Sequence, residues 1–421
     1  PAGFVFGDSK EGIIKCGSYV GNGSATAGPE INLGWEAQYI LIKNRDNSAD
    51  WVVVDSMRGI VTSGDDDDKM LQPNLSATEF NGNFVNLTST GFKILDANAM
   101  VNTNGASYIY MAIRRSDGYV GKPPELGTDV FAMDAGAGSS TIPNFDSGFP
   151  VDFAFIKTIA GSNSWTTSAR LIQGKYLYTN TNDAESAWDK MVFDSNTGWN
   201  NHSSYGSGDQ SWMWKRHAGF DVVCYEGHSN SQAITINHSL NKIPEMMLIK
   251  QRTDAGYSWI VYHKGLNGGT NPHQYFMMLN STDAEASSTF LPSAPTSTSI
   301  RLSGSAAAVN NANKNYLMML FASVDGISKV GSYTGTGADL TITLGFQPRF
   351  VLIKDADNTA SWHLFDTVRG IASGNDKVLL LNDTDAQINE DRIDLTSDGM
   401  TLHGMGSTNE NNMNFIYYAH A

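Results

Sequence analysis

The feature that most constrains the fold is a short hydrophobic run, ending in lysine, that occurs four times. The runs are residues 39–43, 153–157, 246–250 and 350–354. A tryptophan follows each lysine after eight or nine residues, at Trp51, Trp165, Trp259 and Trp362. A segment that recurs at regular distance is typical of a chain built from structural repeats. The sequence therefore predicts four related units.

Two further landmarks place the unit boundaries. A polar turn beginning at asparagine follows each tryptophan, at Asn74, Asn180, Asn280 and Asn382, and an aromatic strand closes each copy. The predicted units are residues 12–115 (unit 1), 116–219 (unit 2), 220–322 (unit 3) and 323–421 (unit 4), of which unit 2 is the most divergent. Each unit has the size of a two-sheet sandwich of about 100 residues.

Composition agrees with an all-β chain. Only 17% of the residues are charged, whereas Gly, Ser, Thr and Asn are abundant and the apolar runs are rich in Val, Ile, Phe and Tyr. Such residues favour short strands joined by many turns. We therefore expect four tandem antiparallel β-sandwiches of the jelly-roll or lectin-like kind.

The repeated run also makes local predictions. It shows almost no polar alternation, so we expect the strand to be buried on both faces. Its lysine would mark where the strand leaves the core, and the tryptophan would cap the edge of the sandwich. In units 1 and 4 the next strand ends in Asp55-Ser56-Met57-Arg58-Gly59 and its counterpart at residues 366–370, which predicts a turn closed by an Asp–Arg salt bridge. A binding role for the arginine is the alternative.

The N-terminal residues 1–11 stand apart from unit 1. Phe4, Val5 and Phe6 occupy the place that the closing strand of unit 3, residues 319–322, has before unit 4. We expect them to form a strand of a preceding unit or a strand exchanged with a neighbouring subunit. An ordinary edge strand is the alternative.

Unit 4 carries a combination of motifs that has a known parallel. Residues 344–348 (LGFQP) precede the hydrophobic run, and Trp362, the Asp366–Arg369 turn, the Asn382 turn and residues 396–400 (TSDGM) follow. This combination resembles a repeat of tail-fibre-like proteins of bacteriophages, especially marine ones. Unit 1 fits well, with Ala37 where proline is usual, and units 2 and 3 fit in outline. The resemblance implies a virion structural or host-attachment protein of lectin-like sandwiches, and brings no catalytic residues.

Several classes of function are disfavoured. The net charge is −15 and no dense Lys/Arg cluster exists, so we expect no nucleic-acid partner. No apolar run of about 18 residues indicates membrane insertion. Cys16 and Cys224 fall in different units, and no metal-type spacing or cofactor motif is present, so we expect no disulfide, metal or cofactor. The run Asp65–Asp68 could bind Ca²⁺, but it lacks the alternation of a calcium loop and favours a solvated turn.

Binding is a more natural use of this composition than catalysis. No nucleophile, acid–base pair or phosphate loop stands out, so we predict that the protein is not an enzyme. The richest aromatic set lies in unit 2, and its candidate carbohydrate-binding residues are Trp188, Trp199, Tyr205 and Trp212. Because Trp212 and Trp214 alternate along the closing strand, a place in the core is the alternative for that strand.

The sequence thus predicts an extracellular protein of the virion surface, of tail-fibre or appendage type. We expect it to form a homo-oligomer and to bind bacterial surface glycan through several weak sites. A purely structural spacer, assembled by strand addition through Phe4–Phe6, is the second hypothesis. A polysaccharide-degrading enzyme is the third.

Overall fold

A computed structural model describes residues 12–60, 68–115, 121–228, 232–304 and 306–421. Within them the chain is almost entirely antiparallel β-structure, so the predicted all-β class is confirmed. The helices described are one turn of α-helix and four short 3₁₀ segments: α1 (Gly406–Asn409), η1 (Gly127–Asp129), η2 (Arg170–Ile172), η3 (Leu266–Gly269) and η4 (Pro272–Gln274).

Each predicted unit contains one six-stranded sheet and one smaller sheet among the described residues. In unit 1 the large sheet has the order β1 (Ile14–Val20), β9 (Ser107–Arg114), β3 (Ala37–Asn44), β4 (Val52–Asp55), β5 (Asp68–Leu71) and β6 (Phe80–Gly82). The small sheet of unit 1 has the order β2 (Glu30–Asn32), β8 (Gly91–Ile94) and β7 (Val85–Thr88).

The large sheets of units 2–4 repeat that strand order. In unit 2 it is β10 (Phe131–Ala135), β17 (Asp209–Trp214), β12 (Phe153–Thr158), β13 (Thr166–Ala169), β14 (Lys175–Tyr178) and β15 (Ser186–Ala187). In unit 3 it is β18 (Phe220–Glu226), β25 (Asn315–Phe321), β20 (Met246–Gln251), β21 (Ile260–His263), β22 (Tyr275–Met278) and β23 (Ala286–Ser287). In unit 4 it is β26 (Ser328–Thr334), β34 (Asn414–His420), β28 (Phe350–Asp355), β29 (His363–Asp366), β30 (Asp376–Leu380) and β31 (Ile388–Glu390).

The small sheets of these units pack on one face of the large ones. They are β11 (Phe145–Asp146) with β16 (Gly198–Trp199), β19 (Ile234–Asn237) with β24 (Ser299–Leu302), and β27 (Leu340–Thr343) with β33 (Gly399–Leu402) and β32 (Ile393–Thr396). Between the two sheets of each sandwich lies a separate apolar core. This arrangement buries every second residue of the central strand, such as Met247 and Ile249 in unit 3.

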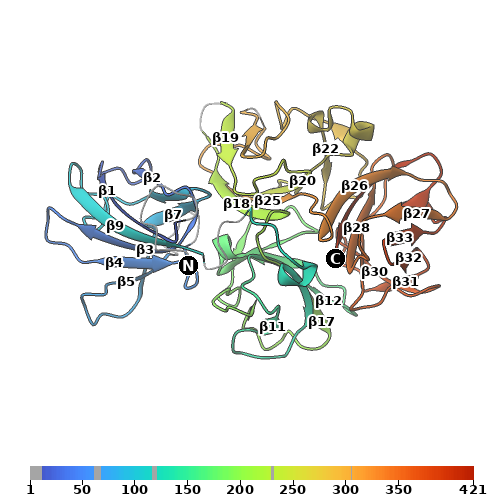
Figure 1. The fold of residues 1–421 in the computed structure, drawn as a ribbon, viewed down its shortest axis with the longest axis horizontal. Helices are drawn as coiled ribbons and strands as arrows, with labels where there is room; N and C mark the ends of the chain where they lie inside the picture. Colours follow the sequence, from blue (N-terminus) through green and yellow to red (C-terminus); the bar gives the residue numbers. More distant parts are fainter. Residues whose placement is uncertain (1–11, 61–67, 116–120, 229–231, 305) are drawn as a thin grey trace.

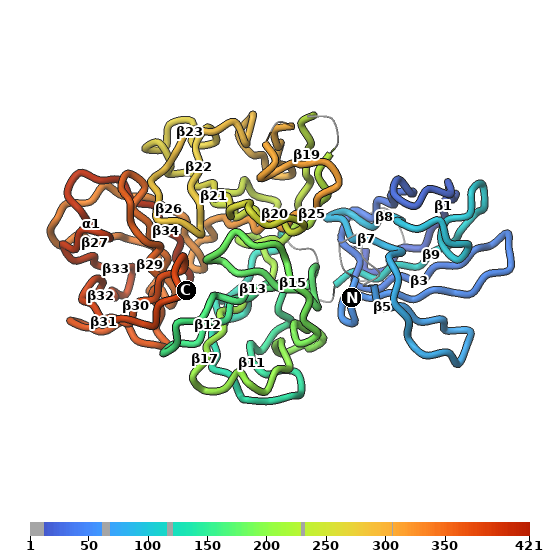
Figure 2. Tube along the Cα trace, turned by 180° about the vertical axis from the view of Figure 1, so that it is seen from behind, coloured from blue at the N-terminus to red at the C-terminus, as the bar shows by residue number. Residues whose placement is uncertain are grey.

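In units 2–4 the other face of each large sheet is covered by the neighbouring units. Units 2, 3 and 4 group together, in green, yellow and red, while the blue unit 1 lies to one side (Figure 1). Figure 2 shows the same grouping from behind. Rings from different units meet at the centre of the group, where Phe131 is 5.5 Å from Phe350, Phe153 is 5.9 Å from Phe220, and Phe321 is 4.9 Å from Tyr418.

The repeated tryptophans join units 2–4 into a closed ring. The indole N–H of Trp165 in unit 2 donates to the carbonyl of Leu380 in unit 4 (2.9 Å). That of Trp362 in unit 4 donates to Met278 in unit 3 (3.1 Å), and that of Trp259 in unit 3 donates to Tyr178 in unit 2 (2.8 Å). These carbonyls occupy equivalent positions, so the three contacts form a pseudo-three-fold cycle, which we call the ring.

Two local expectations are corrected by this packing. The three ring tryptophans do not cap a sandwich edge but are fully or almost fully buried between units. The lysines of units 2–4 do not leave the core: Lys157, Lys250 and Lys354 are buried. The ammonium group of Lys157 donates to a carbonyl of the following loop, and those of Lys250 and Lys354 donate to the carbonyl of the last residue of their own strand. Burial lowers the pKa of each of these three lysines to about 8.

The expectation of a strand buried on both faces holds in three units. β12, β20 and β28 are buried along almost their whole length, whereas β3 in unit 1 alternates between buried and half-buried residues. The Asp–Arg turns form as predicted, with Arg58 Nε 2.6 Å from Asp55 and Arg369 Nε 2.5 Å from Asp366.

The polar turn that recurs in the sequence has a structural role in every unit. The side-chain oxygens of Asn74, Asn180, Asn280 and Asn382 accept the backbone N–H of the tryptophan in their own unit at 2.7–2.9 Å. Each asparagine thereby fixes the start of the strand that carries the tryptophan.

We predict that Asn280→Ala destabilises the ring. The substitution removes the acceptor of the backbone N–H of Trp259, and an unpaired buried donor costs about 1–3 kcal/mol of stability. Urea unfolding followed by tryptophan fluorescence measures the loss. The exposed Asn237→Ala is the control, and equal stabilities of the two variants would contradict the assigned role.

Candidate functional site

Two of the four predicted sugar-binding residues come together in unit 2. The ring of Trp188 lies 5.9 Å from that of Tyr205, and His202 and Tyr176 pack beside it, with ring centroids 4.6 and 5.8 Å from that of Trp188. All four side chains are partly exposed. The backbone places Trp188 because its N–H donates to the carbonyl of Gly174 (2.7 Å), directly after β15.

The other two predicted residues do not reach the surface. Trp199 and Trp212 have no exposed area. The indole of Trp199 donates to the hydroxyl of Ser211 inside the sandwich (3.0 Å), and that of Trp212 donates to Asp366 of unit 4 (3.1 Å), below the guanidinium of Arg369. Both side chains belong to the packed interior and are not part of the candidate site.

Beside Trp188 lies a cleft between units 1 and 2, with a volume of about 600 Å³. Its wall combines one large aromatic side chain with groups of both charges. The lining includes Arg58 and Lys69 from unit 1, and Lys175, Trp188, Asp189 and Asp194 from unit 2. Burial and the nearby Asp55 raise the pKa of Asp194 above the ordinary value of an aspartate.

The floor of the cleft requires a close approach of the two units. Gly59 has a φ of 134°, a conformation that disfavours any side chain. A Cβ at Gly59 would lie 2.9 Å from the side-chain nitrogen of Gln173 in unit 2. That nitrogen donates to the carbonyl of Met57 in unit 1 (3.3 Å). The glycine of the Asp–Arg turn thus permits the contact that brings Arg58 into the cleft.

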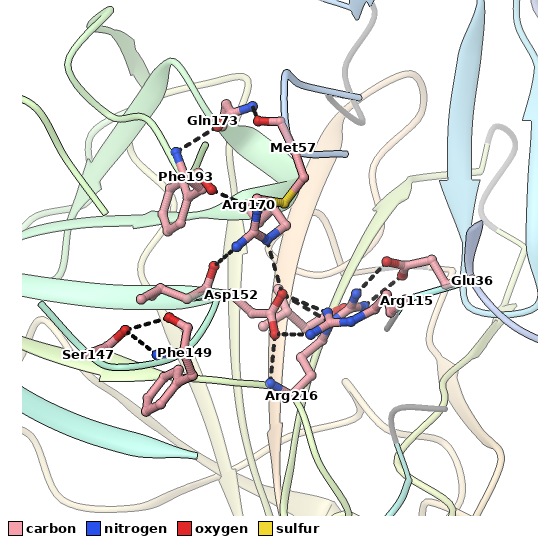
Figure 3. A network of polar contacts seen from close by, with 12 residues as sticks. Glu36, Met57, Arg115, Ser147, Phe149, Asp152, Arg170, Gln173, Phe193 and Arg216 are labelled. Carbon is pink, nitrogen blue, oxygen red and sulfur yellow. Dashed lines mark hydrogen bonds and ion pairs between the residues drawn. The ribbon is translucent and has the colours of Figure 1, made fainter. Parts of the chain in front are cut away.

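Next to this contact a buried polar network holds unit 1 on unit 2 (Figure 3). At its centre the carboxylate of Asp152 accepts two hydrogen bonds from Arg115, at 2.7 and 2.9 Å, and one from Arg170 at 3.3 Å. It also accepts the backbone N–H of Arg216 (2.7 Å). The guanidinium of Arg216 binds Glu36 of unit 1 through two parallel hydrogen bonds, one of 2.6 Å.

Electrostatics explain why this network is stable. Although burial opposes it, the guanidinium groups of Arg115, Arg216 and Arg170 hold the pKa of Asp152 well below its usual range. Burial lowers the pKa of Arg170 to about 10, whereas Glu36 raises the pKa of Arg216 despite burial. A buried ion pair is stable only when hydrogen bonds satisfy both partners, and here they do. The network thus connects unit 1 to unit 2 beside the cleft through satisfied, buried ion pairs.

Other predicted features fall partly or wholly outside the described residues. Phe4, Val5 and Phe6 lie outside them, as do Asp65, Asp66 and Asp67. Asp68 is buried and accepts the backbone N–H of Val85 (3.1 Å). Within the described ranges no group of three or more His, Cys, Asp or Glu side chains could hold a metal ion. Among the same residues no helix is long and apolar enough to cross a membrane.

The chain matches the family described as "Domain of unknown function (DUF7483)" over residues 3–116 and 206–421. This match covers more than half of the chain, and the protein belongs to that family. The unmatched segment contains most of unit 2, the unit that carries Trp188. No curated protein matches the chain.

We predict that Asp152→Asn weakens the attachment of unit 1. The variant leaves three arginines without their common carboxylate, and breaking a buried ion pair costs about 3–5 kcal/mol. Urea unfolding at pH 7 measures the loss, and Asp189→Asn, an exposed aspartate of the same unit, is the control.

The pH dependence of this difference has a definite sign. The pKa of Asp152 is lower in the folded than in the unfolded chain, so its contribution is present above the unfolded value of 3.8 and is lost as the pH falls through the folded value. The difference between the native protein and Asp152→Asn should be constant from pH 7 to pH 5 and shrink below pH 4. A difference that grows with acidification would contradict the assignment.

Proposed function

We propose that this protein is a structural protein of a bacteriophage virion, of tail-fibre or appendage type, that binds host-surface glycan. The observation that carries the proposal is the cleft beside Trp188, in which an aromatic ring lies next to cations and carboxylates of two units. The resemblance of units 1 and 4 to tail-fibre repeats supports the virion setting.

The chemistry of the cleft suits an acidic polysaccharide. The face of Trp188 can stack on the apolar face of a sugar ring, as aromatic residues do in ligand sites. Arg58 and Lys69 lie on the wall that unit 1 contributes, where they can pair with carboxylate or phosphate groups of the glycan. Asp189 and Asp194 can accept hydrogen bonds from sugar hydroxyls.

Binding to immobilised lipopolysaccharide and capsule fractions of candidate hosts tests the proposal. We expect saturable binding to one fraction, weakened about tenfold or more by Trp188→Ala, because such a ring supplies a large part of the contact energy. Tyr257→Ala, a half-buried aromatic of unit 3, should bind like the native protein. Equal binding by both variants, or no binding to any fraction, would count against the cleft.

A pair of lysines gives a matched test of charge. The ammonium of Lys69 donates to Asn81 (2.8 Å), and in unit 4 Lys377 makes the same contact with Asn389 (2.8 Å), away from the cleft. We expect Lys69→Glu to weaken binding of an acidic glycan and Lys377→Glu to leave it unchanged. Release of soluble sugar during the assay would instead favour the enzymatic hypothesis.

A further inference from the structure

Unit 1 leaves partly exposed the sheet face that units 2–4 bury in the ring, with only Val53 of that face buried. Alternate residues of its large sheet point away from its own core, and we call their surface the outer face of unit 1. The outer face consists of Ile14 and Cys16 of β1, Tyr39, Leu41 and Lys43 of β3, Val53 and Leu71 of β4 and β5, and Ile109, Met111 and Ile113 of β9.

Strand register identifies the equivalent residues in the ring. Leu41 faces Met111 across β3 and β9, as Leu248 faces Met319 in unit 3 and Leu352 faces Tyr418 in unit 4. The ring residues are all at most 5% exposed. Ile109 is 40% exposed, whereas its equivalents in units 3 and 4, Leu317 and Ile416, are at most 1% exposed.

The outer face carries the same apolar pattern without the cover. Leu41, Met111, Ile113 and Leu71 are half-buried, although the same positions in units 3 and 4 lie in the packed centre of the ring. Contiguous apolar surface on a soluble protein marks an interaction site. Unit 1 therefore has the sequence pattern of a ring member, but within one chain it lacks the neighbouring units that surround a ring member.

Trp51 is prepared for the ring contact but does not make it within the chain. Its backbone N–H is held by Asn74 as in the other units (2.9 Å), yet its side chain is half-buried. In the ring, each indole donates to a backbone carbonyl on the fifth strand of the neighbouring large sheet. The residue that carries this carbonyl comes one position after the residue that matches Leu71 of unit 1. In unit 1 that residue is Gln72, and its carbonyl is the equivalent of the Tyr178 carbonyl, which accepts from Trp259.

A charged pair at the rim of the outer face also matches a contact between ring units. Arg252 of unit 3, two residues after the lysine, binds Glu185 of unit 2 at 2.7 Å, and the Glu185 backbone N–H donates to the Arg252 carbonyl (2.8 Å). The equivalent residues of unit 1 are Arg45 and Glu79, with 65% and 39% of their side chains exposed. Within the chain each has a local partner, Asp46 at 3.3 Å from Arg45 and Arg58 at 3.0 Å from Glu79, so the contact between subunits adds a second partner to each. The pair is absent between units 3 and 4, where Ala356 replaces the arginine, so unit 1 retains a specific feature of one ring interface.

We propose that three copies of this chain associate through the outer faces of their units 1 and reproduce the ring between subunits. Trp51 of each copy donates to the Gln72 carbonyl of the next, and Arg45 of each copy pairs with Glu79 of the next. The contact is head-to-tail, as in the ring, where each unit donates its indole N–H to one neighbour and offers its acceptor carbonyl to the other. A head-to-tail contact with this rotation closes after three members, as it does in units 2–4.

The mass of the intact chain in solution is the first test. Light scattering after size exclusion should give three times 45.6 kDa at micromolar concentration. A monomer or a dimer at every concentration up to about 100 µM would overturn the proposal, because specific interfaces of this type have dissociation constants at or below that range.

Charge reversal then tests the register of the interface. Arg45→Glu and Glu79→Arg should each raise the concentration needed for trimer formation about tenfold or more, because each places like charges together. The double variant should restore the trimer, since each new pair is again of opposite charge. A trimer that ignores all three variants would overturn the assigned surface.

An apolar position provides a variant that leaves folding intact. Met111→Glu introduces a charge at a half-buried position and should abolish the trimer, whereas Ile243→Glu, at an exposed apolar residue of unit 3, should keep it. Circular dichroism confirms folding of both. Loss of the trimer on deletion of residues 1–11, with Met111→Glu still trimeric, would favour strand addition and overturn the proposal.

Discussion

The structure depends on one constraint: the central strand of each large sheet is apolar on both sides. A sandwich covers one side with its small sheet, and the second side must be covered by something else, because burial of that surface is the main stabilising contribution available to a chain of short strands. In units 2–4 the second sides cover one another. The closed cycle of indole N–H donors, from Trp165, Trp259 and Trp362, fixes the relative rotation of the sheets.

The period and class of the fold were accessible from sequence because they rest on local patterns. The absence of polar alternation in residues 246–250 and 350–354 correctly indicated burial on both faces. The sequence could not predict which part of the molecule covers the second face of the strand. The pattern indicates that this surface is buried, but it does not identify the residues that bury it. The same limit explains the lysines. The sequence predicts that Lys250 marks the point where its strand leaves the core, whereas the structure buries it, with its ammonium donating to the carbonyl of Gln251 at the end of β20.

The candidate site shows the same division between local and non-local information. An unusual density of aromatics in unit 2 pointed to Trp188 and Tyr205, but it pointed equally to Trp199 and Trp212, which lie in two different cores. Nothing local separates a tryptophan that faces a cleft from one that faces a neighbouring unit. The wall contributed by Arg58 depends on Asp152, Arg170 and Arg216 docking unit 1, and these residues are far apart in sequence.

A ring assembled from a single polypeptide differs from a symmetric oligomer because its units can differ from one another in sequence. When one gene segment supplies every subunit, each substitution occurs at every copy of an interface at once. Covalent linkage of units 2–4 removes that coupling, so unit 2 can carry the aromatic cluster around Trp188 while unit 3 has Ser288 at the corresponding position, directly after β23. The fused ring is thus a scaffold in which one member is free to vary in surface chemistry while the other two preserve the packing.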